Sequence, residues 1–533
     1  MPLGLSEEKL SGLNHELAVA RIRSDVASDF IFAPHLSSIY EWSGDALWNQ
    51  LRAELKGGRY VPASPVGIEV PKSSGFSRPG TVLLPCDRLA YQIVVDALVP
   101  NAERHLDRDR VFSCVPLDDD PKGLMFKPPG DSFKRFMQKM GSLARDPRYP
   151  YVLRADVSSY FERIYQHNLV NALGSAHCDE SLVSFLGSLL SCFTHTDSHG
   201  IVQGEYPSDF LGTFYLGTID VKHRAAGIPS VRYVDDMYFF FSNERDARIH
   251  RTTLASWLRQ EALSLNEHKC ELAPSLSLLE QETKVTRLFE DARQEGLDNF
   301  LQNDDPYSSP QVPWDFANDN GFVDEDDAKT IELGAVRSLF SLLEEIDDSE
   351  RIYGQIEKYC LSAFAKADDS IAVDYVLRQY PRRPHMALAY AVYLGSLALH
   401  DREVARTAQR LIVDPDVCLD FQLMWLCAVL TNADELLPQT LDWATWGISH
   451  RSSSVALRAV YPILLGRFGG PSQHQVLRES YADEPSEYVR AAILYASRYL
   501  PASEQTMCVK NWRNHSPLNG LVAESLKLLP VRS

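Results

Sequence analysis

Three carboxylates stand beside runs of apolar residues that are typical of buried strands. Asp156 follows YVLRA (151–155), and Asp235 and Asp236 interrupt VRYVDDMYFFF (231–241). Because like charges repel and an unpaired buried carboxylate is costly, such acids need a compensating positive charge. Carboxylates from separate strands can hold two divalent cations, which clamp the attacking and leaving oxygens of a phosphoryl transfer. The residues therefore indicate a two-metal nucleotidyl-transfer site.

Three further stretches accompany the acids, whereas the Asp pair alone would also suit an ordinary hairpin turn. GIVQGEYPS (200–208) precedes an apolar helical run, and its glycines would let the backbone approach a nucleotide or a template base closely. LNEHK (265–269) follows the second acidic stretch, and VPKSSGFSRPGTVLLP (70–85) precedes the first. Strand ends joined to loops are where a rigid scaffold presents catalytic groups, so we expect these stretches to surround one site.

These stretches, in this order and spacing, resemble the fingers and palm motifs of reverse transcriptases. Motif A is 156–161, motif B is 200–208, motif C is 233–236, motif D is 265–269, and 70–98 looks like the fingers segment. The resemblance covers roughly residues 55–285. It implies an α+β fingers and palm domain and an RNA-directed DNA polymerase, that is, a DNA nucleotidyltransferase.

The resemblance also implies roles for individual residues. Asp156 and Asp235 would bind both Mg²⁺ ions (Mn²⁺ being possible), with Asp236 in support and the Val157 carbonyl completing a metal shell. Phe161 would close the pocket under the sugar and disfavour a ribose 2′-OH. The expected nucleotide contacts are Lys72, Arg78, Gln203 and Gly204, and Lys269 would protonate the leaving pyrophosphate. Core packing for Phe161 and a solvated surface position for Lys269 are the plainer alternatives.

Motif B departs from the usual pattern, because Glu205 follows Gln203-Gly204 where the family has a small residue. A nucleic-acid groove is normally electropositive, so we expect Glu205 to add negative charge beside the template path. The fingers phrase and the helical tail look like those of bacterial abortive-infection and related "unknown group" defence reverse transcriptases. That resemblance implies anti-phage DNA synthesis, template-independent and protein-primed. A retron-like enzyme copying a cognate non-coding RNA and an inactive palm serving as a scaffold remain alternatives.

The chain of 533 residues is too long for one hydrophobic core, so two or three domains are expected. Its nine scattered cysteines form no CxxC pair, which favours reduced thiols in a cytosol. The formal charge is −19, but residues 281–350 hold 19 acidic and 5 basic residues, so the remainder has a net charge of only −5. The overall charge therefore says little about what the remainder binds.

The C-terminal part has apolar residues at helical spacing throughout. Leu388, Leu423, Leu457, Val489 and Leu521 align at intervals of 32 to 35 residues, which suggests stacked helix pairs of HEAT or TPR type, a plain bundle being the alternative. We expect a helical N-terminal fingers segment over 1–54, fingers and palm over 55–290, an acidic linker over 291–330 and an α-helical repeat domain over 331–533.

The expected partners follow from the resemblance. They are dNTPs, a single-stranded DNA product that can stay covalently attached, a non-coding RNA in the templated alternative, and further copies of the chain in a homo-oligomer. Tyr40, in PHLSSIYEWSG ahead of the fingers, is the candidate priming tyrosine, with a packed or surface tyrosine as the alternative. No signal peptide or membrane-spanning run stands out, so a bacterial cytoplasmic location is expected.

Overall fold

The computed structural model describes residues 2–118, 120, 122–194, 197–284, 287–288, 291, 325–348 and 350–529. The chain divides into two compact units. The first comprises 1–70, 77–279 and 441–533, and the second comprises 71–76 and 280–440. This division differs from the expected domains, because the helical tail is split near residue 440 and its last part belongs with the fingers and palm. The expected linker at 291–330 lies largely outside the described residues.

The first unit begins with four helices and a hairpin. The helices are α1 (Glu7–Ser11), α2 (His15–Asp25), α3 (Pro34–Trp42) and α4 (Gly44–Lys56), and the hairpin is β1 (Val66–Pro71) with β2 (Ser77–Val82). The long helix α5 (Pro85–Glu103) packs against α2 and α4. Most of the side chains of α5 are buried, in accordance with the apolar helical run expected there.

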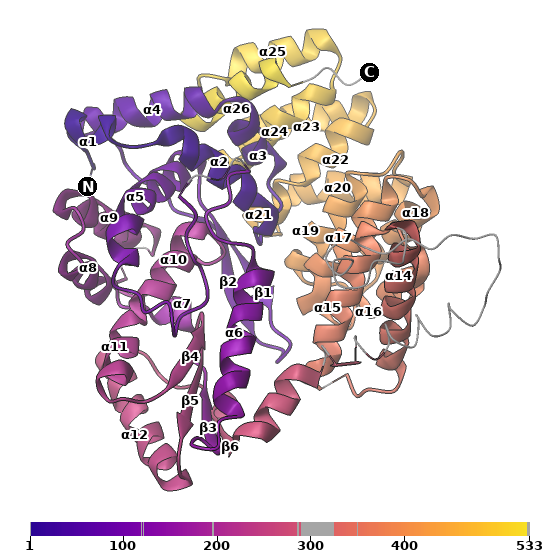
Figure 1. Cartoon of the computed structure of the whole chain (residues 1–533). Helices are drawn as coiled ribbons and strands as arrows, with labels where there is room; N and C mark the ends of the chain where they lie inside the picture. Colours follow the sequence, from indigo (N-terminus) through magenta and orange to yellow (C-terminus); the bar gives the residue numbers. More distant parts are fainter. Residues whose placement is uncertain are drawn as a thin grey trace. The chain divides into compact units, whose positions relative to one another are not determined.

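The palm is a four-stranded antiparallel sheet in the order β4-β5-β3-β6 (Figure 1). Its strands are β3 (Tyr151–Ala155), β4 (Ser230–Tyr233), β5 (Asp236–Phe241) and β6 (Glu271–Pro274). In the register Ala155 faces Met237, and Tyr233 faces Asp236 across the β4–β5 hairpin. The end of β3 and the β4–β5 turn therefore meet at one edge of the sheet, which is where all three sequence-predicted carboxylates lie.

Helices cover both faces of the palm sheet. On one face α6 (Pro129–Ala144) packs through Phe136 and Met140 on Val152, Tyr238 and Phe240. On the other face α12 (Glu244–Gln260) packs on β3 and β5. The remaining helices of this region are α7 (Tyr160–Arg163), α8 (Gln166–Ser175), α9 (Glu180–Phe193), α10 (Tyr206–Tyr215) and α11 (Gly217–Ala225). Successive side chains of β5 point to opposite faces of the sheet, and those from Met237 to Phe241 are all buried because both faces are covered by helices.

The C-terminal helices of the first unit return to the N-terminal helices (Figure 1). They are α20 (Pro438–His450), α21 (Val455–Arg458), α22 (Tyr461–Phe468), α23 (Pro471–Asp483), α24 (Glu487–Ala496), α25 (Ala502–Trp512) and α26 (Pro517–Leu528). α26 packs along α3, where the buried hydroxyls of Ser38 and Ser525 lie 3.1 Å apart. The His35 and Tyr488 rings meet edge to face at 4.6 Å. The C-terminal segment is therefore part of the fingers core.

The second unit contains α14 (Glu325–Ser341), α15 (Arg351–Lys366), α16 (Val373–Gln379), α17 (Ala387–Ala398), α18 (Arg402–Arg410) and α19 (Asp420–Leu430). α17 packs against both α15 and α19, so alternate helices stack on one another. The five aligned apolar residues of the tail fall in α17, α19, α21, α24 and α26, and α24 likewise packs between α22 and α26. The largely helical tail is thus confirmed, and its assignment to a HEAT-like family stays a prediction.

Ending the chain after residue 440 should abolish soluble expression. The truncation removes α26, which packs on α3, and with it the buried side chains of Leu518, Leu521 and Val522, each at most 4% exposed. Each such side chain contributes about 1.5–3 kcal/mol on burial, and several together approach the roughly 5–15 kcal/mol that stabilise a whole domain. A chain ending after residue 529 is the control. A soluble truncated protein with an unchanged melting temperature would show the C-terminal helices to be independent of the fingers.

Candidate active site

Asp156 emerges from the end of β3 and is held by the segment that follows α12. Its side chain is buried, and its Oδ2 accepts a hydrogen bond of 2.9 Å from the Asn266 side chain. The Lys269 ammonium lies 3.2 Å from Oδ1, and the Asn266 backbone N–H donates to the Asp156 carbonyl at 2.8 Å. Asn266 and Lys269 therefore fix both the backbone and the carboxylate of Asp156.

The β4–β5 turn that carries Asp235 is strained and tied down from both sides. Val234 has φ = +56°, a left-handed conformation that is rare for a β-branched residue. Its N–H donates to Ser113 Oγ at 2.9 Å, and its carbonyl accepts from the Arg232 guanidinium at 2.7 Å. Because strained backbone persists only where its surroundings hold it, these two bonds set the position of Asp235.

Arg232 is itself anchored in the core. Its guanidinium pairs with Asp220 of α11 at 2.5 Å and donates to the Thr213 carbonyl of α10 at 3.0 Å. Both charged side chains are almost completely buried. The catalytic turn is thus linked to two helices behind the sheet. Arg232, Asp220 and Ser113 are not among the residues predicted from the sequence, although a basic residue inside the apolar strand VRYV was a signal that a buried partner exists.

The three carboxylates influence one another electrostatically. Burial raises the pKa of Asp235 to about 7, and repulsion from Asp156 and Asp236 adds to the shift, while Lys269 opposes it. Asp236 lies 3.7 Å from the Arg154 guanidinium of β3. The acids predicted from sequence to meet are therefore brought together, and Lys269, placed there only through the family resemblance, lies among them.

The donor set fits divalent cations that prefer oxygen, although Lys269 now supplies the positive charge beside Asp156. Within the described residues, no three His, Cys, Asp or Glu side chains are grouped so that they could hold a metal ion as they stand. Burial, and after it repulsion from Asp156 and Asp236, raises the pKa of Asp235 and so disfavours its ionised form, which a bound cation would favour. Mg²⁺ would bind here through Asp156 and Asp235 once Lys269 withdraws, and Val157 directly follows the first of these ligands.

Phe161 lies on the short helix α7, next to the loop of motif B. Its ring rests against α10 at Gly212, where an added Cβ would lie 3.0 Å from a ring carbon. Its carbonyl accepts a 3.0 Å hydrogen bond from the N–H of Ile201. The ring is half-buried, so Phe161 combines packing on α10 with an accessible edge. This geometry is compatible with either role that the sequence suggested.

The glycine of motif B is required by its surroundings. Gly204 has φ = +95°, and an added Cβ would lie 2.9 Å from the ring of Phe30, in the loop before α3. The Arg78 guanidinium lies 4.7 Å above the same ring, and burial lowers the pKa of Arg78. Gln203 beside Gly204 is half-buried. Phe30 thus connects the fingers cation with motif B, a role with no signal in its own sequence context.

Lys72 lies in the turn of the β1–β2 hairpin. Its backbone N–H donates to the Phe76 carbonyl at 2.7 Å, and the Gly75 N–H donates back to the Lys72 carbonyl at 3.1 Å. The turn belongs to the second compact unit, whereas Arg78 belongs to the first. A triphosphate contact by Lys72 therefore stays a prediction.

The expectation for Glu205 was wrong. Its side chain is 1% exposed at the start of α10 and so adds no charge to an exposed groove. Burial raises its pKa to about 8, although the nearby Arg88 opposes the shift. Arg88 itself is buried and pairs with Asp25 and Asp29. Glu205 thus belongs to a buried polar cluster beneath motif B, which removes the objection to template binding.

The structure does not favour Tyr40 as the priming residue. Tyr40 is 1% exposed in α3, where the Arg88 guanidinium lies 5.9 Å above its ring, and its hydroxyl has no hydrogen-bond partner among the described residues. Burial raises its pKa well above 10. A primer must reach the metal site, lose its proton there and then move away with the growing strand, and a tyrosine held in this core can do none of these without a local opening.

Comparison with known proteins supports the chemistry of this site. Residues 70–288 match the family model described as reverse transcriptase (RNA-dependent DNA polymerase). No curated protein matches the chain. The matched solved structures include telomerase from Candida tropicalis with the TWJ fragment of telomeric RNA, at 11% identity and a TM-score of 0.31, covering 75% of this chain and 67% of that one.

Two further matches are similar in extent. Apo telomerase from Candida tropicalis has 11% identity and a TM-score of 0.28, covering 91% of this chain and 74% of that one. Telomerase from Candida albicans with the TWJ fragment has 10% identity and a TM-score of 0.30, covering 82% and 66%. The family assignment rests on the sequence match, because these TM-scores do not define a shared fold. The carboxylate cluster lies within the matched segment, which is therefore a reverse transcriptase domain and makes the chain an RNA-directed DNA polymerase.

Proposed function

We propose that this chain synthesises DNA from dNTPs by two-metal nucleotidyl transfer as a bacterial anti-phage defence enzyme. The observation that carries the chemistry is the meeting of Asp156, Asp235 and Asp236 at one edge of the palm sheet, where burial, and after it repulsion from Asp156 and Asp236, raises the pKa of Asp235. An inactive palm would have no reason to keep this costly arrangement, so the scaffold alternative is disfavoured.

Different residues of the chain would have different roles in the reaction. Asp156 and Asp235 would hold the cations, whose chemistry is to neutralise charge on the transferring phosphoryl group and its two flanking oxygens. Lys269, 3.2 Å from Asp156, would be released when a cation takes its place and could then protonate the departing pyrophosphate. Arg78 would bind the triphosphate, since its buried Nε has no hydrogen-bond partner among the described residues.

The defence role and template-independent, protein-primed synthesis are supported by the motif resemblance and by the helical tail that follows the palm. The priming residue is left open, because Tyr40 is buried. Homo-oligomerisation and a cytoplasmic location belong to the same proposal. No helix in the described part of the chain is long and apolar enough to cross a membrane.

The test is to purify the protein from its host, digest it with nuclease and search by peptide mass spectrometry for a nucleotide adduct. A deoxynucleotide on a tyrosine supports protein priming and identifies the residue. Incorporation of dNTPs without added nucleic acid supports template independence. An active polymerase that carries no adduct and requires an added RNA would refute both.

A second candidate function is RNA-templated synthesis on a cognate non-coding RNA. The observation that favours it is the burial of Glu205, which leaves motif B without the acidic obstacle expected from sequence. Sequencing of RNA that copurifies with the protein separates the two candidates. One enriched structured RNA complementary to the DNA product would establish the templated enzyme.

Phe161→Ala should raise the use of rNTPs relative to dNTPs on the order of tenfold or more. Removing the ring opens the space that a ribose 2′-OH needs. Discrimination against one small added group in a closed pocket is typically worth about 1–3 kcal/mol. The measurement is the ratio of kcat/KM for rNTP and dNTP. Phe214→Ala, which removes a buried ring of α10, is the control for lost packing. An unchanged ratio with lowered stability would assign Phe161 to the core.

A further inference from the structure

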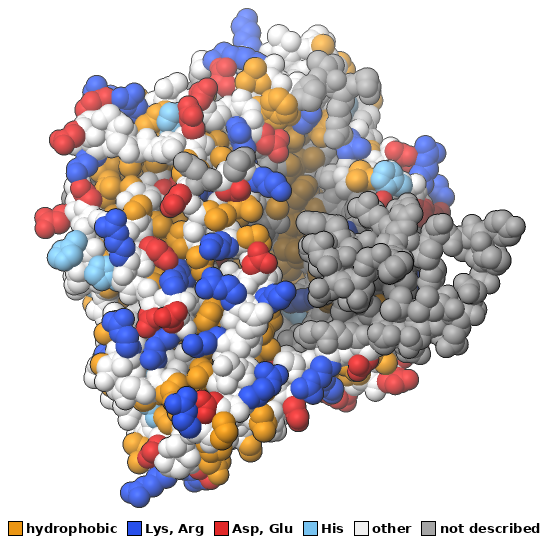
Figure 2. Space-filling model, in the orientation of Figure 1, with side chains coloured by type: hydrophobic (Ala, Val, Ile, Leu, Met, Phe, Trp, Pro, Cys, Tyr) orange, Lys and Arg blue, Asp and Glu red, His pale blue; other side chains and the backbone are white. Residues whose placement is uncertain are grey.

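The segment around α6 is strongly basic in an otherwise acidic protein. Residues 122–148 contain seven Lys and Arg and only two acidic residues, whereas the whole chain has a formal charge of −19. Lys and Arg side chains predominate over acidic ones on the part of the surface where α6 lies (Figures 1 and 2). A local reversal of this kind points to an anionic partner.

The cations of α6 occupy one side of the helix. At 100° per residue, four exposed basic residues fall within a sector of about 140°. These are Lys134, Arg135, Lys139 and Arg145, which we call the α6 cationic face. The opposite side of the helix contains Phe136 and Met140, which pack on the palm sheet. The helix is therefore held in the protein by its apolar side and presents its charged side to solvent.

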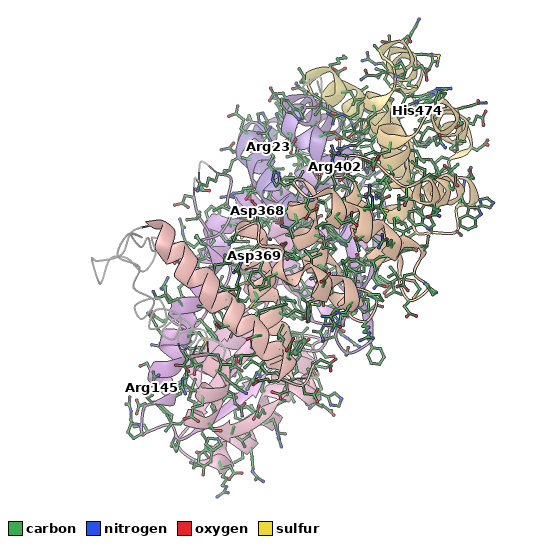
Figure 3. All side chains as sticks on the ribbon, turned by 90° about the vertical axis from the view of Figure 1, so that its right-hand side faces the viewer. Arg23, Arg145, Asp368, Asp369, Arg402 and His474 are labelled. Carbon is green, nitrogen blue, oxygen red and sulfur yellow. The ribbon has the colours of Figure 1, made fainter. Side chains whose placement is uncertain are left out.

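The α6 cationic face has no acidic partner among the residues that the structure describes. Among the described residues, none of its four side chains lies within ion-pairing distance of an acidic group, whereas the neighbouring Arg148 pairs with Asp146 at 2.6 Å. Arg145 lies on the outside of the molecule at the far end of α6 (Figure 3). A solvated helix surface usually mixes both signs of charge, whereas here the four cations share their sector with one exposed acid, Asp131, so the excess of positive charge calls for a partner.

The N-terminal part of α6 lies beside motif C. Phe133, 47% exposed near the start of α6, meets the Tyr233 ring of motif C edge to face at 5.5 Å. Phe136 packs on Tyr238 at 5.7 Å, and the Arg154 guanidinium that approaches Asp236 lies 5.9 Å above that same Tyr238 ring. From Lys134 to Arg145 the helix rises about 16 Å away from the carboxylates.

We propose that the α6 cationic face, together with the exposed Phe133 near the start of the same helix, binds a single strand of nucleic acid along its phosphates and leads it to or from the carboxylates. The inference rests on the proposed polymerase function and adds the path of the strand. Its parts are a row of cations for phosphates and an aromatic edge for a base, the combination that proteins use to bind single strands without regard to sequence. Template and product share this chemistry, and the experiment separates them.

The palm itself offers a matched control. α12, on the other face of the same sheet, presents four exposed arginines, namely Arg245, Arg248, Arg251 and Arg259. Changing these four to Gln removes the same charge as Lys134→Gln, Arg135→Gln, Lys139→Gln and Arg145→Gln together. Any effect of bulk charge appears in both variants, and only an effect of position distinguishes them.

The measurement is the affinity of each variant for fluorescent single-stranded DNA and RNA oligonucleotides of one sequence, over a range of salt concentrations. Asp235→Asn in every protein removes synthesis, so binding is read without it. The α6 variant should bind on the order of tenfold more weakly or worse, and its slope of log affinity against log salt should flatten by about 3, since each phosphate contact to a single strand contributes roughly 0.7. The α12 variant should match the parent.

Equal losses in the two variants, or an unchanged salt slope in the α6 variant, would overturn the proposal. A larger loss for RNA identifies the template strand, and a larger loss for DNA identifies the product. Phe133→Leu should weaken binding without changing the salt slope, because stacking involves no charge. If strand binding follows this pattern but the protein with Asp235 intact proves unable to incorporate nucleotides, the polymerase proposal fails while the strand path stands.

Discussion

Asp235→Asn is expected to lower dNTP incorporation by more than about 100-fold, because even groups that only support a metal ligand contribute roughly 10–100-fold. Asp235 is placed by the strained Val234 turn to face Asp156, and the amide removes its charge with little change in volume. The measurement is single-turnover incorporation with Mg²⁺ in excess. Asp236→Asn, beside the Arg154 guanidinium, is the matched control and should retain more activity. Parent-like incorporation by Asp235→Asn would exclude the two-metal assignment.

The same variant should reveal the metal without any turnover. Mg²⁺ should raise the melting temperature of the parent, because a ligand that binds only the folded state stabilises it, and should do so much less for Asp235→Asn. When a chelator removes the metal, Asp235→Asn should be more stable than the parent above about pH 7. A carboxyl whose pKa is raised on folding stabilises the fold only while it is protonated, so stability falls as pH rises through about 7 in the parent and not in the variant.

The catalytic carboxylates could be found from the sequence because they belong to local patterns. An acid that ends or interrupts an apolar strand run is an anomaly that demands an explanation, and Asp156, Asp235 and Asp236 are anomalies of this kind. The strand runs themselves were short and apolar with aromatic residues, and they became β3, β4 and β5 as expected. Local chemistry and local composition therefore sufficed for these three strands.

What the sequence could not show depends on contacts between distant segments. Glu205 and Tyr40 have polar or mixed neighbours in sequence, yet both are buried beside Arg88 of α5, which is distant from each of them along the chain. The division of the tail near residue 440 has the same origin. Helical periodicity runs through both halves, and only the packing of α26 on α3 assigns the second half to the fingers. Periodicity specifies helices but not the surface that each one meets.

The Arg232–Asp220 pair illustrates how such a distant contact acts on catalysis, and it is the target of the last prediction. Arg232→Met should lower the free energy of unfolding by about 3–5 kcal/mol, because it leaves Asp220 buried without a partner. Arg232→Met with Asp220→Leu should recover most of that loss, since an apolar pair of similar volume avoids the cost of burying charge. Arg148→Met, which breaks a surface pair, should change stability by no more than about 1 kcal/mol.

Activity should not follow stability in this series. The double variant folds, but the Val234 carbonyl no longer receives the 2.7 Å hydrogen bond from Arg232, so the strained turn is free to relax and Asp235 loses its position. We expect on the order of 10–100-fold lower incorporation by the double variant at parent-like stability, comparable to the loss of a group that orients a metal ligand. Urea unfolding and single-turnover incorporation measure the two quantities separately. If activity returned together with stability, Arg232 would be a core residue without a positioning role, and the Ser113 hydroxyl alone would suffice to hold the turn.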